Sequence, residues 1–275
     1  MSSNVATIPL NDGTTIPQLG LGVFQMTEDE AEAAVLCAHD EGYVLIDSAA
    51  GYENERAVGK AVAQHDRKDF YLTTKLKNDD QGFDETLRAF DASIDKLGVD
   101  TLDLYLIHWP SPARDKYVDS WRALIRLRDE GRVTSIGVSN FEPHHLKRII
   151  AETGVVPAIN QIELHPLLQQ MTRREIHREL GIVTQAWSPL ASGKGDLLVH
   201  PLLAAIARDH KATPAQVTLA WHLAIGNIVI PKSVTPARIV ENLASTKLTL
   251  SGSELHRILS MDDGTRFGPH PDDFV

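Results

Sequence analysis

The sequence has only one cysteine, Cys37, among its 275 residues, and a single cysteine cannot form a disulfide within the chain. It also lacks any run of about 18 uncharged apolar residues, which excludes a membrane-spanning helix of ordinary length. Residues 1–5 have neither a basic start nor a hydrophobic stretch, so no secretory signal is predicted. These absences favour a cytoplasmic location.

Positive charge is scarce as well. The chain carries 27 Lys and Arg residues against 37 Asp and Glu residues, a formal net charge of -10. A field of that sign repels nucleic acid and anionic lipid, so we expect neither as a partner. We expect a monomer that acts on a small molecule, and any anion should bind in a local basic pocket.

Apolar residues are plentiful enough to build a large core, because they make up 43% of the chain. No low-complexity linker or block of like charge divides the sequence, so we predict one domain over residues 1–275. A turn at Asn11-Asp12-Gly13 between short apolar runs predicts a β-hairpin at the start of that domain.

Short runs of apolar and β-branched residues alternate with longer amphipathic stretches after the hairpin. The runs are 19–23, 43–46, 70–74, 102–107, 134–138, 158–162, 182–186 and 227–230. Strands that alternate with helices imply a parallel α/β sheet, and eight of them favour a closed (β/α)8 TIM barrel over an open doubly wound sheet. The Gly-x-Gly-x-x-Gly fingerprint of the open sheet fails, because Gln25 stands at its last position.

The stretches between the runs carry helix signals. The segment 84–97 places four apolar side chains on one helical face, namely Leu87, Phe90, Ile94 and Leu97. Pro143 stands at an early position of another predicted helix, where its missing N–H is tolerated. Thr213 is a predicted N-cap of a third.

A polar or aromatic residue follows almost every predicted strand. These residues are Asp47, Lys75, His108, Ser139, Asn140, Gln161, Trp187, Lys232 and Ser233. Active sites of such barrels lie at the carboxyl ends of the strands. One polar residue there is typical of a loop start, but an acid, a lysine and a histidine after successive strands indicate a shared active site.

Tyr52 lies five residues beyond Asp47 and is the obvious phenol near this site. Taken alone it would be a loop residue that packs at a helix start. A lysine held charged by Asp47 favours the phenolate and lowers the phenol pKa. A free tyrosine has a pKa of about 10, so reaching about 7 requires roughly 4 kcal/mol of differential stabilisation. Lys75 can supply much of that energy if it lies close to Tyr52.

Six ordered motifs resemble those of the aldo-keto reductase family, in particular its bacterial members similar to 2,5-diketo-D-gluconate reductases. The resemblance covers the chain from about residue 6 onward. The motifs are Asp47-Ser-Ala-Ala-Gly-Tyr-Glu-Asn-Glu55, Thr74-Lys-Leu76, Asp103-Leu-Tyr-Leu-Ile-His-Trp-Pro110, Gly137-Val-Ser-Asn-Phe141, Asn160-Gln-Ile-Glu-Leu-His-Pro166 and the segment Ile230–Asn242. This resemblance implies a (β/α)8 barrel that uses NADPH without a Rossmann domain and reduces small aldehydes or ketones.

The resemblance also implies catalytic roles. Tyr52 matches the general acid that protonates the carbonyl oxygen. Lys75 matches the residue that lowers the pKa of that acid, and Asp47 matches the partner of the lysine. His108 matches the group that orients and polarises the carbonyl.

The cofactor residues implied by the resemblance lie on several loops. Ser139, Asn140 and Gln161 match residues that bind the carboxamide, and Trp187 matches the aromatic side chain that stacks on the nicotinamide. The loop after Trp187 would close over the pyrophosphate, and its candidate contacts are Ser188, Leu190, Ser192 and Lys194.

Two cations and a hydroxyl around one helix start suit a phosphate group. These residues are Lys232, Ser233 and Arg238. The residues alone also fit a solvated helix start. The resemblance implies a pocket for the 2′-phosphate and the adenine, with Glu241 and Asn242 reading the base.

Phe24, Lys77 and Trp109 are the candidate substrate-pocket residues. Lys77 stands where relatives often have a bulky aromatic residue, and it either attracts an anionic substrate or points to water. Ser48 is a mild departure from the family motif. The tail 267–275 is short, so we expect a shallow, permissive mouth.

Two other functions fit parts of the sequence. One is a cofactor-sensing barrel protein without significant turnover, which the intact set of acid, lysine, aspartate and histidine argues against. The other is a metal-dependent hydrolase that uses His108 with His165 or with His144 and His145. Too few metal ligands stand at strand ends for that chemistry, so no metal is expected.

Overall fold

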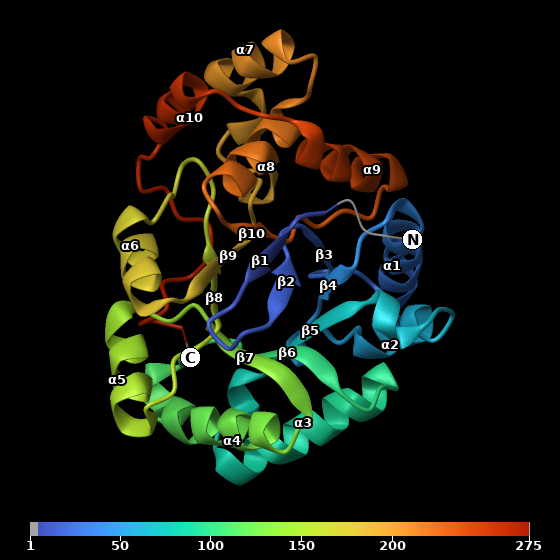
Figure 1. Ribbon diagram of the computed structural model, residues 1–275, viewed down its shortest axis with the longest axis vertical. Coiled ribbons are helices and arrows are strands. Elements are labelled where there is room, and N and C mark those ends of the chain that lie inside the picture. Colours follow the sequence, from blue (N-terminus) through green and yellow to red (C-terminus); the bar gives the residue numbers. More distant parts are fainter. Residues whose placement is uncertain (1–4, 275) are drawn as a thin grey trace.

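Eight parallel strands form a barrel at the centre of the computed structural model, which describes residues 5–274 (Figure 1). Residues 1–4, on which the absence of a secretory signal partly depends, lie outside the described residues, as does residue 275. The strands are β3 (Gly20–Gly22), β4 (Leu45–Asp47), β5 (Tyr71–Leu76), β6 (Leu102–Ile107), β7 (Val133–Ser139), β8 (Ile159–Glu163), β9 (Val183–Trp187) and β10 (Ile228–Val229).

The first and last strands of this sheet meet and close the barrel. Isolated parallel bridges join Leu19 to Val229 and Gly22 to Lys232. The backbone N–H of Val229 donates to the carbonyl of Gln18 at 3.0 Å. The predicted TIM barrel is therefore confirmed, and each predicted strand overlaps an observed one.

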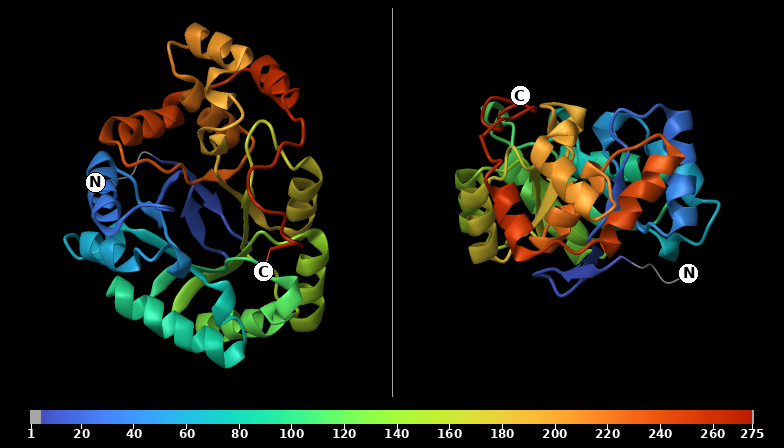
Figure 2. Two further views of the ribbon diagram at one scale, coloured as in Figure 1. Left: turned by 180° about the vertical axis from the view of Figure 1, so that it is seen from behind. Right: turned by 90° about the horizontal axis from the view of Figure 1, so that it is seen from above.

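A ring of helices surrounds the barrel (Figure 2, left). They are α1 (Glu28–Glu41), α2 (Glu55–Val62), α3 (Phe83–Leu97), α4 (Tyr117–Asp129), α5 (Pro143–Thr153), α6 (Met171–Leu180), α7 (Pro201–Asp209), α8 (Pro214–Ala224), α9 (Pro236–Ala244) and α10 (Gly252–Leu259). The predicted N-cap is confirmed, because the side chain of Thr213 accepts a hydrogen bond from the backbone N–H of Gln216 at the start of α8. Within residues 5–274, every helix is too short or too polar to span a lipid bilayer.

The predicted hairpin closes the end of the barrel at which the strands begin (Figure 2, right). It consists of β1 (Thr7–Pro9) and β2 (Thr15–Pro17), which pair antiparallel. Its Leu10 and Ile16 belong to an apolar cluster with barrel residues such as Leu45. Figure 2 (right) shows the hairpin on the face opposite the C-terminal tail. The carboxyl ends of the strands are therefore the end at which a site can form.

Candidate active site

A buried lysine connects the polar residues at the strand ends. Lys75 lies on β5 and is fully buried, and Asp47 at the end of β4 is only 1% exposed. The Lys75 Nζ donates to Asp47 Oδ1 at 2.5 Å, to the carbonyl of Ser48 at 2.9 Å and to the Tyr52 hydroxyl at 3.3 Å. The predicted juxtaposition of acid, lysine and phenol is thus present.

The loop after β4 places the phenol. Tyr52 ends a short 3₁₀ turn, and Glu53 after it adopts a left-handed conformation with φ 59°. Asn54 is buried, donates to the carbonyl of Val23 at 2.9 Å and accepts from the Ser48 hydroxyl at 3.1 Å. These bonds fix the loop, so the orientation of the half-buried Tyr52 is determined by backbone structure as well as by the lysine.

Two rings flank the phenol. The Phe24 ring centroid lies 4.9 Å from that of Tyr52. The His108 ring, which follows β6, lies 5.6 Å away in an edge-on arrangement. A carbonyl oxygen that sits between the phenol and the imidazole can therefore meet both groups.

Asp47, the partner of Lys75, makes a second contact that the sequence did not indicate. The Gln161 Nε2 donates to Asp47 Oδ2 at 2.7 Å and to Gln185 Oε1 at 3.0 Å. Asp47 is therefore held on one oxygen by the lysine and on the other by Gln161. The only sequence signal for Gln185 is a polar residue inside an otherwise apolar strand.

The charges of the site follow from burial and close contact. Burial lowers the pKa of Lys75, but Asp47 and Tyr52 outweigh it, so the net pKa is raised and the ammonium is charged at neutral pH. Burial, followed by the charge of Lys75, lowers the pKa of His108 to about 3. The imidazole is therefore neutral at physiological pH and can donate one hydrogen bond.

A lowered pKa for Tyr52 was expected from the sequence, and this expectation is wrong, because the net pKa is raised. Burial raises this pKa more than Lys75 lowers it, and Asp47 adds to the rise. The contribution of Lys75 has the expected sign. The phenol consequently stays protonated at neutral pH, which is the state that a general acid requires.

Hydrogen bonds also fix the rim beside the candidate catalytic residues. Asn140 adopts φ 63°, and its Nδ2 donates to the carbonyl of His108 at 3.0 Å. The Trp187 Nε1 donates to Asn140 Oδ1 at 2.8 Å, and the Ser139 hydroxyl donates to the carbonyl of Gln161 at 2.8 Å. The four carboxamide and stacking residues of the sequence prediction therefore form one connected rim.

The remaining candidate cofactor residues lie on loops after the neighbouring strands β9 and β10. Ser188 and Ser192 share a hydrogen bond of 2.8 Å, Leu190 is half-buried and Lys194 is exposed. Lys232 and Arg238 are exposed, and among residues 5–274 neither forms an ion pair, whereas Ser233 is buried.

Two further predicted residues lie on α9. Glu241 accepts a hydrogen bond of 2.6 Å from the Thr213 hydroxyl, so part of its carboxylate serves the N-terminus of α8. Asn242 is 5% exposed. A contact of either residue with adenine stays a prediction.

The mouth is lined by aromatic residues and reached by the tail. Phe24 is 52% exposed, and the ring of Trp109 lies 4.4 Å from that of Phe274. The short tail therefore extends to the pocket wall, although a shallow mouth was expected. The Lys77 Nζ lies 3.7 Å from Asp79, so its charge has a nearby partner.

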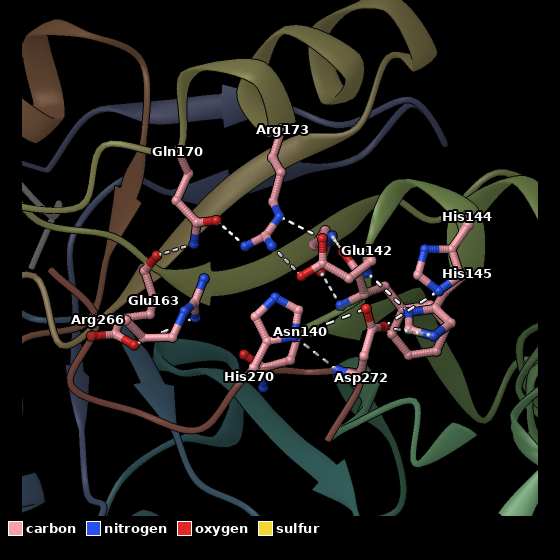
Figure 3. A network of polar contacts seen from close by, with 12 residues as sticks. Asn140, Glu142, His144, His145, Glu163, Gln170, Arg173, Arg266, His270 and Asp272 are labelled. Atoms are coloured by element: carbon pink, nitrogen blue, oxygen red, sulfur yellow. Dashed lines mark hydrogen bonds and ion pairs between the residues drawn. The ribbon is translucent and has the colours of Figure 1, made fainter. Parts of the chain in front are cut away.

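The tail is attached at two places (Figure 3). Glu163 accepts hydrogen bonds from the backbone N–H groups of Phe267 at 2.8 Å and Gly268 at 3.0 Å. Farther along, Asp272 lies beside His144 and His145 at the start of α5.

The hydrolase alternative fails on geometry. His165 contacts Glu163 at 3.1 Å, and His144 and His145 contact the tail. Within the described part of the chain, two groups of at least three side chains could hold a metal, and neither includes His108.

Comparison with known proteins gives a consistent result. The sequence model of the Aldo/keto reductase family matches residues 17–263. The chain is 55% identical over 269 residues to an aldo-keto reductase of Mycolicibacterium smegmatis, covering 97% of each chain. It is 48% identical over 274 residues to the methylglyoxal reductase DkgA of Salmonella typhimurium, covering 99% of each. Among solved structures, it matches a mutant of Gox0644 in complex with NADPH with a TM-score of 0.95 and 47% identity, covering 99% of this chain and 100% of that chain.

Proposed function

The chain belongs to the aldo/keto reductase family, and we propose that Tyr52 is its proton donor, with Lys75 and Asp47 controlling the charge around the phenol. The protein is an NADP-dependent oxidoreductase that reduces the carbonyl of a small aldehyde or ketone to an alcohol. NADPH supplies the hydride when bound. No observation favours the alternative of a cofactor sensor without turnover.

One observation carries the assignment of the acid: a fully buried lysine contacts both a buried carboxylate and the phenol. As hydride reaches the carbonyl carbon, negative charge develops on the oxygen, and the phenol of Tyr52 donates its proton there. The ammonium of Lys75 stabilises the phenolate that remains. His108 is neutral, so its ring orients the carbonyl through a hydrogen bond that it donates and not through a positive charge.

The residues present fit the cofactor. The Trp187 indole, half-buried and held by Asn140, offers a flat apolar face beside polar groups, as a nicotinamide requires. Lys232, Ser233 and Arg238 would hold the 2′-phosphate, supported by two exposed cations with no ion pair among the described residues. Ser139, Asn140 and Gln161 would hold the carboxamide. The loop over the pyrophosphate would use Ser188, Leu190, Ser192 and Lys194, and Glu241 and Asn242 would contact the base.

The substrate pocket follows from the aromatic mouth. Phe24, Trp109 and Phe274 give apolar walls, so we propose a small carbonyl compound with a modest apolar part. The name of the Salmonella relative places methylglyoxal in the first substrate panel. Lys77 is half exposed and could meet an anionic group only by leaving Asp79.

Three broader proposals concern the whole protein: it folds as one domain over residues 1–275, acts as a monomer without nucleic acid, and works in the cytoplasm. The net charge of -10 supports the absence of nucleic acid. The single cysteine is compatible with a reducing compartment. Light scattering coupled to size-exclusion chromatography tests the monomer.

The variant Tyr52→Phe tests the proton donor. It should lose nearly all carbonyl reduction while NADPH binding, followed by quenching of tryptophan fluorescence, stays close to wild type. Tyr105→Phe is the matched control, because the Tyr105 hydroxyl is buried on β6 without a hydrogen-bond partner among the described residues. Retention of more than about a tenth of the wild-type rate in Tyr52→Phe would exclude this residue as the acid.

A further inference from the structure

Two histidines from different segments lie against each other at the end of the barrel opposite the active site. His39 is on the last turn of α1, and His65 follows the end of α2. Their ring centroids are 3.9 Å apart. His39 also stacks on Phe70 at 4.8 Å, and Phe70 directly precedes β5. This places the pair at the amino ends of the strands.

Both imidazoles have nitrogen atoms that the fold leaves free. The Nδ1 of His39 is buried and has no hydrogen-bond partner in the described part of the chain. The ring of His65 also makes no hydrogen bond to another of the described residues. A buried nitrogen without a partner normally costs stability, so a ligand at this position would remove that cost.

Negative charge surrounds the pair. Asp40 follows His39 in the helix, and one ligand atom from each of His39, Asp40 and His65 lies within 4.8 Å of the others. The negative charges of Asp40 and Asp69 both act on His39, which favours a cation at this position.

We propose that His39, His65 and Asp40 form a divalent transition-metal site, with zinc as the best match to two imidazoles and one carboxylate. Ligands of a tetrahedral zinc ion with bonds of about 2.0–2.1 Å lie roughly 3.3 Å apart. A metal–nitrogen bond lies in the plane of the imidazole, so the half-buried His65 ring must turn out of its stack on His39, where the interplanar angle is 35°. Rotation of the exposed Asp40 side chain closes the remaining distance. Water takes the fourth position. The metal connects the ends of α1 and α2 and stabilises the fold, and it lies too far from Tyr52 to take part in carbonyl reduction.

A second cluster of the same composition provides an internal comparison (Figure 3). His144, His145 and Asp272 also lie within reach of one metal. The Nδ1 of His145, however, accepts the backbone N–H of Glu142 at 3.1 Å, so Nε2 of the neutral ring carries the proton and faces Asp272. The positive charge of Arg148 also acts on this ring. His145 therefore has no free lone pair, and only His144 and Asp272 could bind a metal, so the second cluster should bind it much more weakly than the first.

The test measures zinc binding to purified, tag-free, chelator-treated protein by titration calorimetry. Wild type should bind one equivalent, and His65→Ala and Asp40→Asn should weaken binding at least tenfold. His144→Ala and Asp272→Asn should bind as wild type does. Zinc at about 100 times its Kd should raise the wild-type Tm by roughly 5 °C or more, and His65→Ala should lose this rise.

Cobalt supplies a second readout that does not depend on stability. Wild type loaded with Co²⁺ should show the visible absorption of a four-coordinate ion, and His65→Ala should not. The rate of carbonyl reduction should be the same in wild type and His65→Ala. Absence of saturable zinc binding in wild type would overturn the proposal, as would binding that His144→Ala removes and His65→Ala leaves intact.

Discussion

Lys75→Met isolates the charge that the mechanism places beside the phenol. Methionine keeps most of the length and apolar volume of the lysine stem and removes only the ammonium. The change deletes three donated hydrogen bonds, to Asp47, to the carbonyl of Ser48 and to Tyr52. We expect kcat for carbonyl reduction to fall steeply while NADPH still binds.

The distance between the ammonium and the phenol bounds the size of the effect. A charge-assisted hydrogen bond contributes about 1.5–3 kcal/mol. Full Coulomb attraction between Lys75 Nζ and a phenolate oxygen at 3.3 Å gives about 5 kcal/mol at an effective dielectric constant of about 20. At about 1.36 kcal/mol per decade, the rate should fall between roughly tenfold and several thousandfold.

The assay is steady-state reduction of an aldehyde followed by loss of NADPH absorbance across pH. The phenol must be protonated to donate, so the rate falls as pH rises through its pKa. Lys75 lowers that pKa, so its removal should move the alkaline limb to higher pH. A limb that stays in place, or a rate within about threefold of wild type, would refute the coupling of Lys75 to Tyr52.

A double variant separates chemistry from folding. Lys75→Met leaves the buried Asp47 without a counter-charge, which costs roughly 3–5 kcal/mol of stability. Asp47→Asn combined with Lys75→Met removes that lone charge. The double variant should regain thermal stability and remain slow, because the ammonium is still missing.

Two further predictions concern the cofactor and acid stability. Arg238→Ala should weaken NADPH binding by roughly ten- to hundredfold and NADH binding much less, since one charge-assisted bond contributes about 1.5–3 kcal/mol; equal losses in fluorescence titrations would assign Arg238 to the fold or the adenine instead. Burial lowers the pKa of His145 and His177 to about 4 and that of His222 to about 3. In the unfolded chain a histidine has a pKa of about 6.5, so below that pH the unfolded chain binds protons that the folded protein does not bind. The free energy of unfolding should therefore fall by roughly 1 kcal/mol per histidine between pH 7 and pH 5.5. A calorimetric Tm that stays level over this range would contradict the buried neutral state.

Much of the fold could be predicted because burial on both faces leaves continuous apolar runs. The strand 102–107 was predicted with the bounds that β6 has. The first and last strands are shorter than predicted, with three residues in β3 and two in β10. They meet at the seam of the barrel, where single bridges replace a continuous ladder, and the amino-acid pattern of one strand does not report that pairing.

That the candidate catalytic side chains lie together could be predicted because a rule of topology collects strand ends at one rim. Contacts that depend on distant segments were not visible. Gln161 reaches Asp47 across 114 positions of sequence, and Phe274 reaches Trp109 from the tail. The direction of the Tyr52 pKa was also missed, because the sequence reveals the neighbouring lysine but not the extent of burial.

The buried charge of Lys75 and the exposed charges of Lys232 and Arg238 should respond differently to salt, because they differ in burial and pairing. Lys75 is buried and paired, so its field acts in a medium of low polarity on one oxygen atom. Lys232 and Arg238 are exposed and form no ion pair with another described residue, so they are free to meet a phosphate that arrives from water. A chain with a net charge of -10 gains nothing from long-range attraction of such an anion. The proposed phosphate contacts of Lys232 and Arg238 should therefore weaken with salt, whereas the chemical step, in which we propose a role for the buried Lys75, should respond much less to ionic strength.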